Sequence, residues 1–127
     1  MRYIATLALT LLAGFALGAG ATRGLHAQAG KTPAYAIAEV EVTDPRLYQA
    51  YLAKAIDSLK PYNARIIVRA KPDMKEGTPV QGNVVITSFD SLADADKWYS
   101  TPPYKDLIAE RQKSSKSRFY IVEGVPQ

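Results

Sequence analysis

The segment that most constrains the fold is "AYAIAEVEVTDP", which runs from Ala34 to Pro45. Small and apolar residues alternate along it with larger or charged ones, so that Glu39 and Glu41 share one side of the chain. A two-residue period is typical of a β-strand with two different faces. Asp44 then suits a helix N-cap, and Pro45 suits the first helical position, where its missing N–H costs no hydrogen bond. We therefore expect a strand that leads directly into a helix.

The rest of the chain defines the extent of this helix and predicts four more elements. Apolar residues recur at three- and four-residue spacing up to about Lys60, as in an amphipathic helix. The segments 64–70 and 83–89 are rich in β-branched residues and predict two strands. Ser91, with Asp94 three residues later, resembles a capping box at the start of a helical region over 91–115. A Thr-Pro-Pro sequence interrupts this region, and 118–125 predicts the last strand. This β-α-β-β-α-β order predicts a ferredoxin-like α+β fold, whose four-stranded antiparallel sheet has the spatial order 4-1-3-2 and helices on one face.

Residues 1–27 have the layout of a secretory signal peptide. Arg2 precedes an almost uncharged apolar stretch that ends in small residues, and cleavage fits after Ala21 or after Ala27. An uncleaved membrane anchor is an alternative, because the stretch approaches the roughly 20 residues that span a bilayer. A cytosolic protein is another alternative. We expect a signal peptide over 1–27, a linker over 28–33 and one domain over 34–127, in a periplasmic or secreted bacterial protein.

The side chains that remain after cleavage exclude much chemistry. The 127-residue chain has no cysteine, and its one histidine, His26, lies in the predicted signal peptide. A Cys–His dyad, a Ser–His–Asp triad, a zinc site of the usual ligands and a histidine-ligated haem are therefore excluded. Loss of Arg2 and Arg23 leaves 14 basic and 12 acidic residues, with no Lys/Arg block suited to nucleic acid. We expect no metal, no cofactor and no nucleic-acid partner.

The face of the sheet away from the helices carries one set of candidate site residues. By strand alternation, Glu39 and Glu41 of the first strand face that side, and Arg65 and Arg69 of the second strand do so as well. A glutamate would then meet an arginine across the third strand or across a dimer interface. These charges could bind a small anionic or carbonyl-bearing ligand. Alternatively, they form interface ion pairs that set the register of two sheets and do no chemistry.

A second set of candidates surrounds the sequence "KWYSTPPY". Trp98, Tyr104 and Arg111 could line a pocket at the edge between helix and sheet, because Trp and Tyr combine apolar area with a polar group. Tyr48 and Tyr51, three residues apart on the first helix, could face the same pocket. The alternative is structural: Trp98 fills the core, and the tyrosines are partly buried packing residues.

Several of these motifs together resemble the bacterial family known as domain of unknown function 1330. They are "EVTDP" followed by two tyrosines, the strand "RIIVRA", the run "SFDSLADADKWYSTPPY" with a later arginine, and a terminal "VEG". The resemblance covers Ala34 to Val125 and implies a dimeric α+β barrel, in which two ferredoxin-like subunits pack sheet to sheet. The family tends to have glycine pairs where this chain has Asn63-Ala64 and Ala70-Lys71.

Three functions remain open at this point, and no catalytic residue is predicted. The first is an exported homodimer that binds a small organic ligand, either between sheet and helices or at the dimer interface. The second is a cofactor-independent enzyme, of the monooxygenase or isomerase kind, acting on an activated phenolic or carbonyl substrate; this rests on fold analogy alone. The third is a structural or interaction dimer without a ligand.

Overall fold

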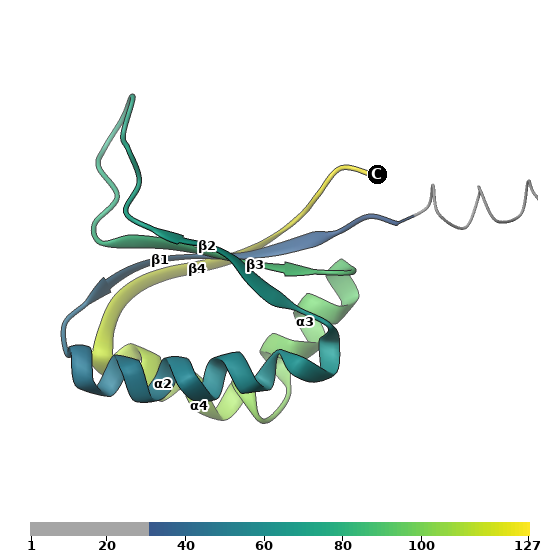
Figure 1. Ribbon diagram of the computed structural model, residues 1–127, viewed down its shortest axis with the longest axis horizontal. Coiled ribbons are helices and arrows are strands. Elements are labelled where there is room, and N and C mark those ends of the chain that lie inside the picture. The colour runs from purple at the N-terminus through teal and green to yellow at the C-terminus, as the bar shows by residue number, and fades with distance from the viewer. Residues whose placement is uncertain (1–30) are drawn as a thin grey trace, which may run out of the picture. The chain divides into compact units, whose positions relative to one another are not determined.

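The computed structural model describes residues 31–127, which form a sheet covered on one face by helices (Figure 1). The elements in chain order are β1 (Ala34–Val42), α2 (Pro45–Ser58), the short 3-10 helix η1 (Lys60–Tyr62), β2 (Arg65–Ala70), β3 (Asn83–Phe89), α3 (Leu92–Ser100), α4 (Tyr104–Ser114) and β4 (Ser115–Glu123). This confirms the predicted βαββαβ order, with the second helical region divided into α3 and α4. The predicted signal peptide lies outside the described residues. Within 31–127, no helix has the length and hydrophobicity that crossing a membrane requires.

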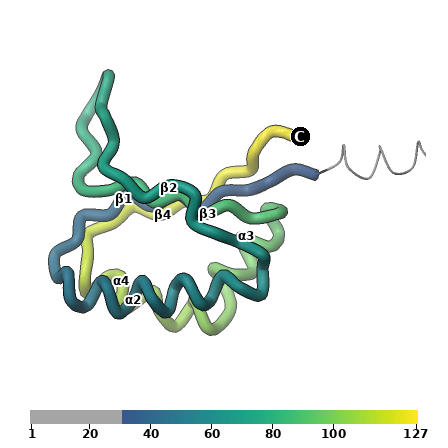
Figure 2. The backbone as a smooth tube through the Cα atoms, viewed as in Figure 1, coloured from purple at the N-terminus to yellow at the C-terminus, as the bar shows by residue number. Residues whose placement is uncertain are grey.

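The four strands pair in the order β2-β3-β1-β4, and every neighbouring pair is antiparallel. This is the predicted 4-1-3-2 order, counted from the other edge. Figure 2 shows all the helices on one side of the sheet, while the connection between β2 and β3 extends away on the opposite side. The sheet therefore has a covered face toward the helices and an uncovered face on the opposite side.

Local sequence signals explain where the helices begin. The Asp44 carboxylate accepts a hydrogen bond from the Leu47 backbone N–H at 3.1 Å, and the Ser91 hydroxyl accepts one from the Asp94 N–H at 3.1 Å. Both bonds satisfy backbone donors of a first helical turn, as predicted for these caps. Asn63, at the turn before β2, has a φ of 51°. Asparagine tolerates this left-handed conformation better than most other residues, so the turn before β2 is retained.

The small residues of β1 determine how the two layers pack. Ala36, Ala38 and Val40 alternate on the covered face and are at most 6% exposed, as the two-residue period predicts. Because alanine fills little volume, the space under the sheet is occupied by large aromatic side chains from the helices, including Trp98 and Tyr104. The core therefore consists of small side chains from the sheet and aromatic side chains from the helices.

The register of β2 against β3 shifts between Ile66 and Val68. Such a bulge adds one residue to a strand, so that the residues after it change face. Arg65 precedes the shift and stays on the uncovered face, whereas Arg69 lies opposite Val85 on the covered face. The prediction that the two arginines share the uncovered face is therefore wrong. Simple alternation cannot account for the inserted residue.

Candidate ligand-binding site

A cavity of about 40 Å³ lies between the covered face and the helices. Its walls on the sheet side are small or β-branched, and its aromatic lining consists of Tyr48, Tyr51, Trp98, Tyr104 and Phe119. One water molecule needs roughly 10–15 Å³, and a cavity that binds benzene measures roughly 150 Å³. The cavity therefore accommodates a few water molecules or a few ligand atoms, and a larger ligand enters only if lining side chains move.

The aromatic wall is held in place by stacking and hydrogen bonds. The rings of Trp98 and Tyr104 stack with centroids 3.8 Å apart, and the Trp98 Nε1–H donates to the Ser58 hydroxyl at 2.9 Å. The hydroxyl oxygens of Tyr51 and Tyr104 are 2.7 Å apart. In such a pair one hydroxyl donates to the other, which leaves one O–H free to donate elsewhere. Trp98 is thus a rigid wall, and the tyrosine pair offers a hydrogen-bond donor.

Burial also makes the cavity tyrosines harder to ionise. It raises the pKa of Tyr51, Tyr104 and Tyr48 above the ordinary value of 10.0, because the phenolate would lose its hydration. For Tyr104 the nearby positive charge of Arg111 partly opposes this rise. All three side chains are neutral phenols at physiological pH. They can donate hydrogen bonds to a ligand but cannot act as bases.

Arg111 is the charged residue of the cavity wall, and it is only 4% exposed. Its Nη1 donates to the Ser117 hydroxyl at 2.6 Å, and its guanidinium carbon lies 5.0 Å from the centre of the Phe119 ring. Its Nε is buried and has no hydrogen-bond partner within residues 31–127. No carboxylate of the described residues forms an ion pair with it. A buried guanidinium usually has such a partner. Because Arg111 has none among residues 31–127, no acidic side chain there compensates its positive charge.

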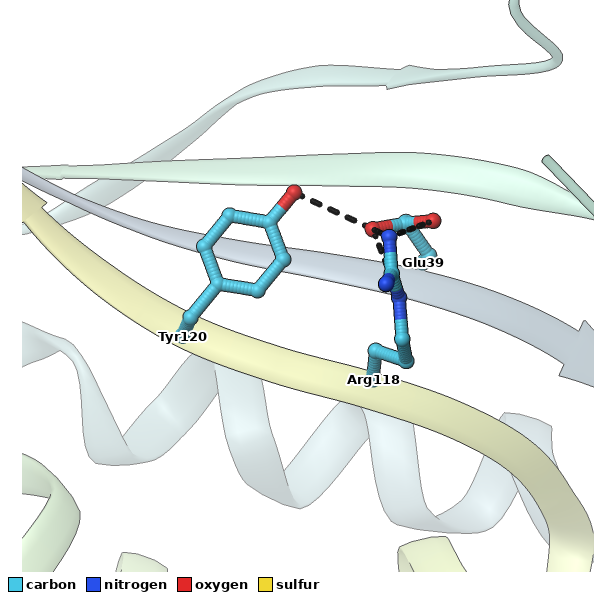
Figure 3. Close-up of polar contacts among 3 residues, drawn as sticks. All are labelled: Glu39, Arg118 and Tyr120. Atoms are coloured by element: carbon cyan, nitrogen blue, oxygen red, sulfur yellow. Dashed lines mark hydrogen bonds and ion pairs between the residues drawn. The ribbon is translucent and has the colours of Figure 1, made fainter. Parts of the chain in front are cut away.

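The uncovered face has a different polar cluster, shown in Figure 3. Glu39 and Arg118 are paired in the register of β1 and β4, and their closest side-chain atoms, Arg118 Nη2 and Glu39 Oε2, are 2.7 Å apart. The Tyr120 hydroxyl donates to the same Glu39 oxygen at 3.1 Å. The hydrogen bond from Arg118 is the main reason that the pKa of Glu39 lies below its ordinary value. Within the chain the partner of Glu39 is therefore Arg118, and the predicted pairing of Glu39 with Arg65 or Arg69 across the third strand is wrong. The alternative pairing across a dimer interface stays a prediction.

Sequence reasoning missed Arg118 and Tyr120, although a signal was present. The predicted strand order already placed the last strand beside the first, and Arg118 and Tyr120 alternate on one face of that strand. Comparison of the two strands would have placed Arg118 and Tyr120 on the same face as Glu39, whereas the register that puts Arg118 opposite Glu39 comes from the structure. The omission came from considering only the first two strands.

The eight predicted ligand-binding residues do not form one site. Tyr48, Trp98, Tyr104 and Arg111 line the cavity, and Tyr51 joins them. The other predicted residues lie elsewhere: Glu39, Glu41 and Arg65 on the uncovered face, and Arg69 on the covered side of the edge strand β2. Across residues 31–127, no three acidic, histidine or cysteine side chains are grouped so that they could hold a metal ion.

Fold and site together define a ferredoxin-like α+β protein with a small, aromatic, donor-lined cavity between its sheet and helices. Residues 33–125 match the family described as Domain of unknown function (DUF1330), and the chain belongs to that family. This confirms the resemblance noted from the sequence. No curated protein matches the chain at significant sequence similarity.

Two solved structures show how widely the fold is shared. The RPA0582 protein of unknown function from Rhodopseudomonas palustris is 15% identical, with a TM-score of 0.58 over 84% of this chain and 93% of that chain. SnoaB, a cofactor-independent oxygenase from Streptomyces nogalater, is 9% identical, with a TM-score of 0.53 over 76% of this chain and 96% of that chain. At such low identities, these likenesses establish the fold alone.

Proposed function

We propose that this protein binds a small organic anion, such as a carboxylate or an enolate, in the cavity between sheet and helices. The observation that carries the proposal is the buried, uncompensated guanidinium of Arg111 at the wall of an aromatic cavity. Burying a charge without a partner is strongly unfavourable, whereas a charge-assisted hydrogen bond from arginine to a carboxylate is among the stronger polar contacts. An anionic ligand would supply the missing partner.

The cavity favours binding over acid–base chemistry. Its polar lining includes donors from Tyr48, Tyr51, Tyr104 and Arg111, together with the hydroxyl of Thr87. In the part of the chain that the structure describes, no aspartate, glutamate or histidine lines it. General base catalysis needs such a group within hydrogen-bond reach of the proton it removes. Donors without a base favour a ligand that arrives already negatively charged.

Calorimetric titration tests the proposal with two flat monocarboxylates, crotonate and benzoate. Crotonate is the smaller probe and needs less movement of the lining. Wild-type protein should bind crotonate, the smaller of the two probes. Arg111→Gln should weaken crotonate binding by tenfold or more, as expected for loss of a charge-assisted contact. The matched control is Arg118→Gln, which removes an arginine from the uncovered face and should leave the affinity within about twofold. Equal affinities of wild type and Arg111→Gln would contradict the proposal.

A second candidate function is cofactor-independent oxygenation of an acidic phenol or enol. The specific observation that favours it is the Tyr51–Tyr104 hydroxyl pair in the same cavity as Arg111, because these donors could stabilise the electron-rich oxyanion that would react with dioxygen. The fold likeness to SnoaB, described as a cofactor-independent oxygenase, supports this candidate by analogy. The substrate would have to ionise without a protein base.

An oxygen electrode tests this candidate with a readily oxidised naphthol. Wild-type protein should accelerate oxygen consumption over the buffer rate, and Tyr51→Phe together with Tyr104→Phe should remove the acceleration. Both variants keep the ring and therefore the packing. If the double variant is as fast as wild type, the tyrosine pair has no part in the reaction.

We also propose that the protein is a homodimer that associates through the uncovered face. Val68, Tyr120 and Val122 expose 37–42% of their surface on that side of the sheet. Large apolar side chains exposed together on one face of a sheet are typical of an interaction surface. The Glu39–Arg118 pair lies among them and would help to fix the register of the two sheets. Val122→Asp should shift sedimentation from dimer to monomer, whereas Lys105→Asp on α4 should not.

Finally, we propose that residues 1–27 direct export and are removed. The layout of the segment, with a positive start, an apolar stretch and small residues at its end, supports this. N-terminal sequencing of the protein from a periplasmic fraction should show a start at Thr22 or Gln28. Recovery of the uncleaved chain in membranes would instead support an anchor.

A further inference from the structure

One row of residues runs across the whole sheet and connects the cavity to the exposed edge of β2. Arg69 is opposite Val85, Val85 is opposite Ala38, and Ala38 is opposite Phe119. The last three line the cavity, and the guanidinium of Arg111 lies over the Phe119 ring. Neighbouring strands are about 4.8 Å apart, so the row spans roughly 14 Å from its first backbone position to its last. One arginine therefore lies at each end of it.

Arg69 reaches this row only because of the bulge in β2. Without the register shift between Ile66 and Val68, strand alternation would place Arg69 on the uncovered face beside Arg65. Bulges often re-aim a side chain next to a functional site. Arg69 is exposed, and no carboxylate within residues 31–127 forms an ion pair with it. The bulge thus brings a second uncompensated arginine to the side of the cavity.

Tyr48 links the two arginines electrostatically. It is a buried lining residue of the cavity, and its burial raises the pKa of its hydroxyl. The positive charges of Arg69 and Arg111 both oppose that rise, Arg69 more strongly. Both guanidinium groups therefore act on the same wall of the cavity, one from the exposed edge and one from the buried end.

We propose that Arg69 is a specificity-determining residue that binds a second acidic group, so that the preferred ligand is a short, planar dianion. The first acidic group would bind Arg111 and the second would point toward the edge of β2. The aromatic walls favour a flat spacer between the two groups. This inference rests on the proposed function, because it requires an anion already bound at Arg111.

Fumarate and crotonate form a matched pair of probes. Both are flat four-carbon trans-alkenes, and crotonate has a methyl group where fumarate has its second carboxylate. In calorimetric titrations at low ionic strength, wild-type protein should bind fumarate about tenfold more tightly than crotonate. Arg69→Gln should remove most of this preference and leave crotonate affinity within about twofold. Arg65→Gln, on the same strand but the uncovered face, should retain the preference.

Salt provides a second readout on wild-type protein. Because Arg69 is exposed, raising the ionic strength from 0.01 M to 1 M should reduce the preference for fumarate. Crotonate affinity, which depends on the buried Arg111, should change less.

The possible failures are distinguishable. If crotonate binds but fumarate binds no more tightly, or if Arg65→Gln abolishes the preference as fully as Arg69→Gln, the role of Arg69 is refuted and the proposed function stands. If wild-type protein binds neither probe at millimolar concentration, the proposed function is refuted and the role of Arg69 with it.

Discussion

Two arginines on opposite faces of the sheet differ in both burial and pairing. Arg118 on the uncovered face has a side chain that is 75% exposed, and it is held by Glu39 and lies close to Tyr120. Arg111 on the covered side is 4% exposed and has no acidic partner among residues 31–127. The exposed charge is thus compensated within the chain, where water would have solvated it in any case. The buried charge is the one that requires a compensating negative charge from a bound ligand.

This contrast supports the proposal that the ligand binds at the covered face. An exposed ion pair contributes little to stability, whereas an uncompensated buried charge is unfavourable by several kcal/mol unless a partner neutralises it. A protein retains such a charge most readily where a ligand completes the site. The uncovered face, with its satisfied polar cluster and exposed apolar residues, is better suited to a second subunit.

Removal of an aromatic side chain should give the largest difference between the two faces in the free energy of unfolding. Trp98→Ala deletes a residue that is 4% exposed, stacked on Tyr104 and hydrogen-bonded to Ser58. We expect a loss of about 3–5 kcal/mol in the free energy of unfolding. Tyr120→Ala on the uncovered face should lose far less in a monomeric background. Urea denaturation measures both, and similar losses would contradict the difference between the faces.

Alkaline pH should act through the covered face. Because the pKa values of Tyr51 and Tyr104 are raised on folding, the folded state keeps protons that the unfolded state releases above pH 10. Their contribution is fully present below pH 10, the ordinary value, and is lost as pH rises through the raised pKa values of the folded state. Tyr51→Phe should make the loss of stability with rising pH shallower. An unchanged slope would show that this tyrosine titrates normally in the folded protein.

Replacing the buried arginine with an apolar residue should stabilise the protein without ligand. Arg111→Met keeps most of the side-chain volume and removes the uncompensated charge, so we expect the free energy of unfolding to rise by about 1–3 kcal/mol. Arg118→Met on the uncovered face should be neutral or slightly destabilising. A clear destabilisation by Arg111→Met would mean that the charge is already compensated in the folded chain.

The smallest effect should come from Glu39. Its pKa is lowered chiefly by the hydrogen bond from Arg118, so the stability that it contributes is present above pH 4.5 and is lost as pH falls through the lowered value. Glu39→Gln should slightly flatten the acid limb of a stability-versus-pH curve. The same flattening is expected for Arg118→Met, and the two changes together should add nothing further. Additive effects in the double variant would show that the two groups act independently.

Much of the fold could be predicted because its signals are local. The alternation in β1, the caps at Asp44 and Ser91 and the proline break before α4 each act within a few residues, and all were confirmed. The sequence also offered Trp98 and Arg111 as residues that could line a pocket, and both line the cavity. The kind of ligand that the cavity would bind could not be predicted from the sequence. The absence of an acidic partner for Arg111 is visible only when every neighbouring side chain is placed.

The errors came from non-local features. The face of Arg69 depends on one inserted residue in β2, and no composition signal in "RIIVRA" marks a bulge. The partner of Glu39 depends on the register of β1 against β4, strands that are about 80 residues apart in sequence. Pairings over such separations are set by packing of the whole sheet rather than by local pattern.

The most direct test of the ligand at Arg111 is mass spectrometry of small molecules released from protein purified from its native compartment. Wild type, Arg111→Met and Arg118→Met would be prepared in parallel. We predict that wild type and Arg118→Met retain the same organic acid and that Arg111→Met retains none of it. Retention of nothing by wild type in repeated preparations, or equal retention by Arg111→Met, would contradict a ligand site at the covered face.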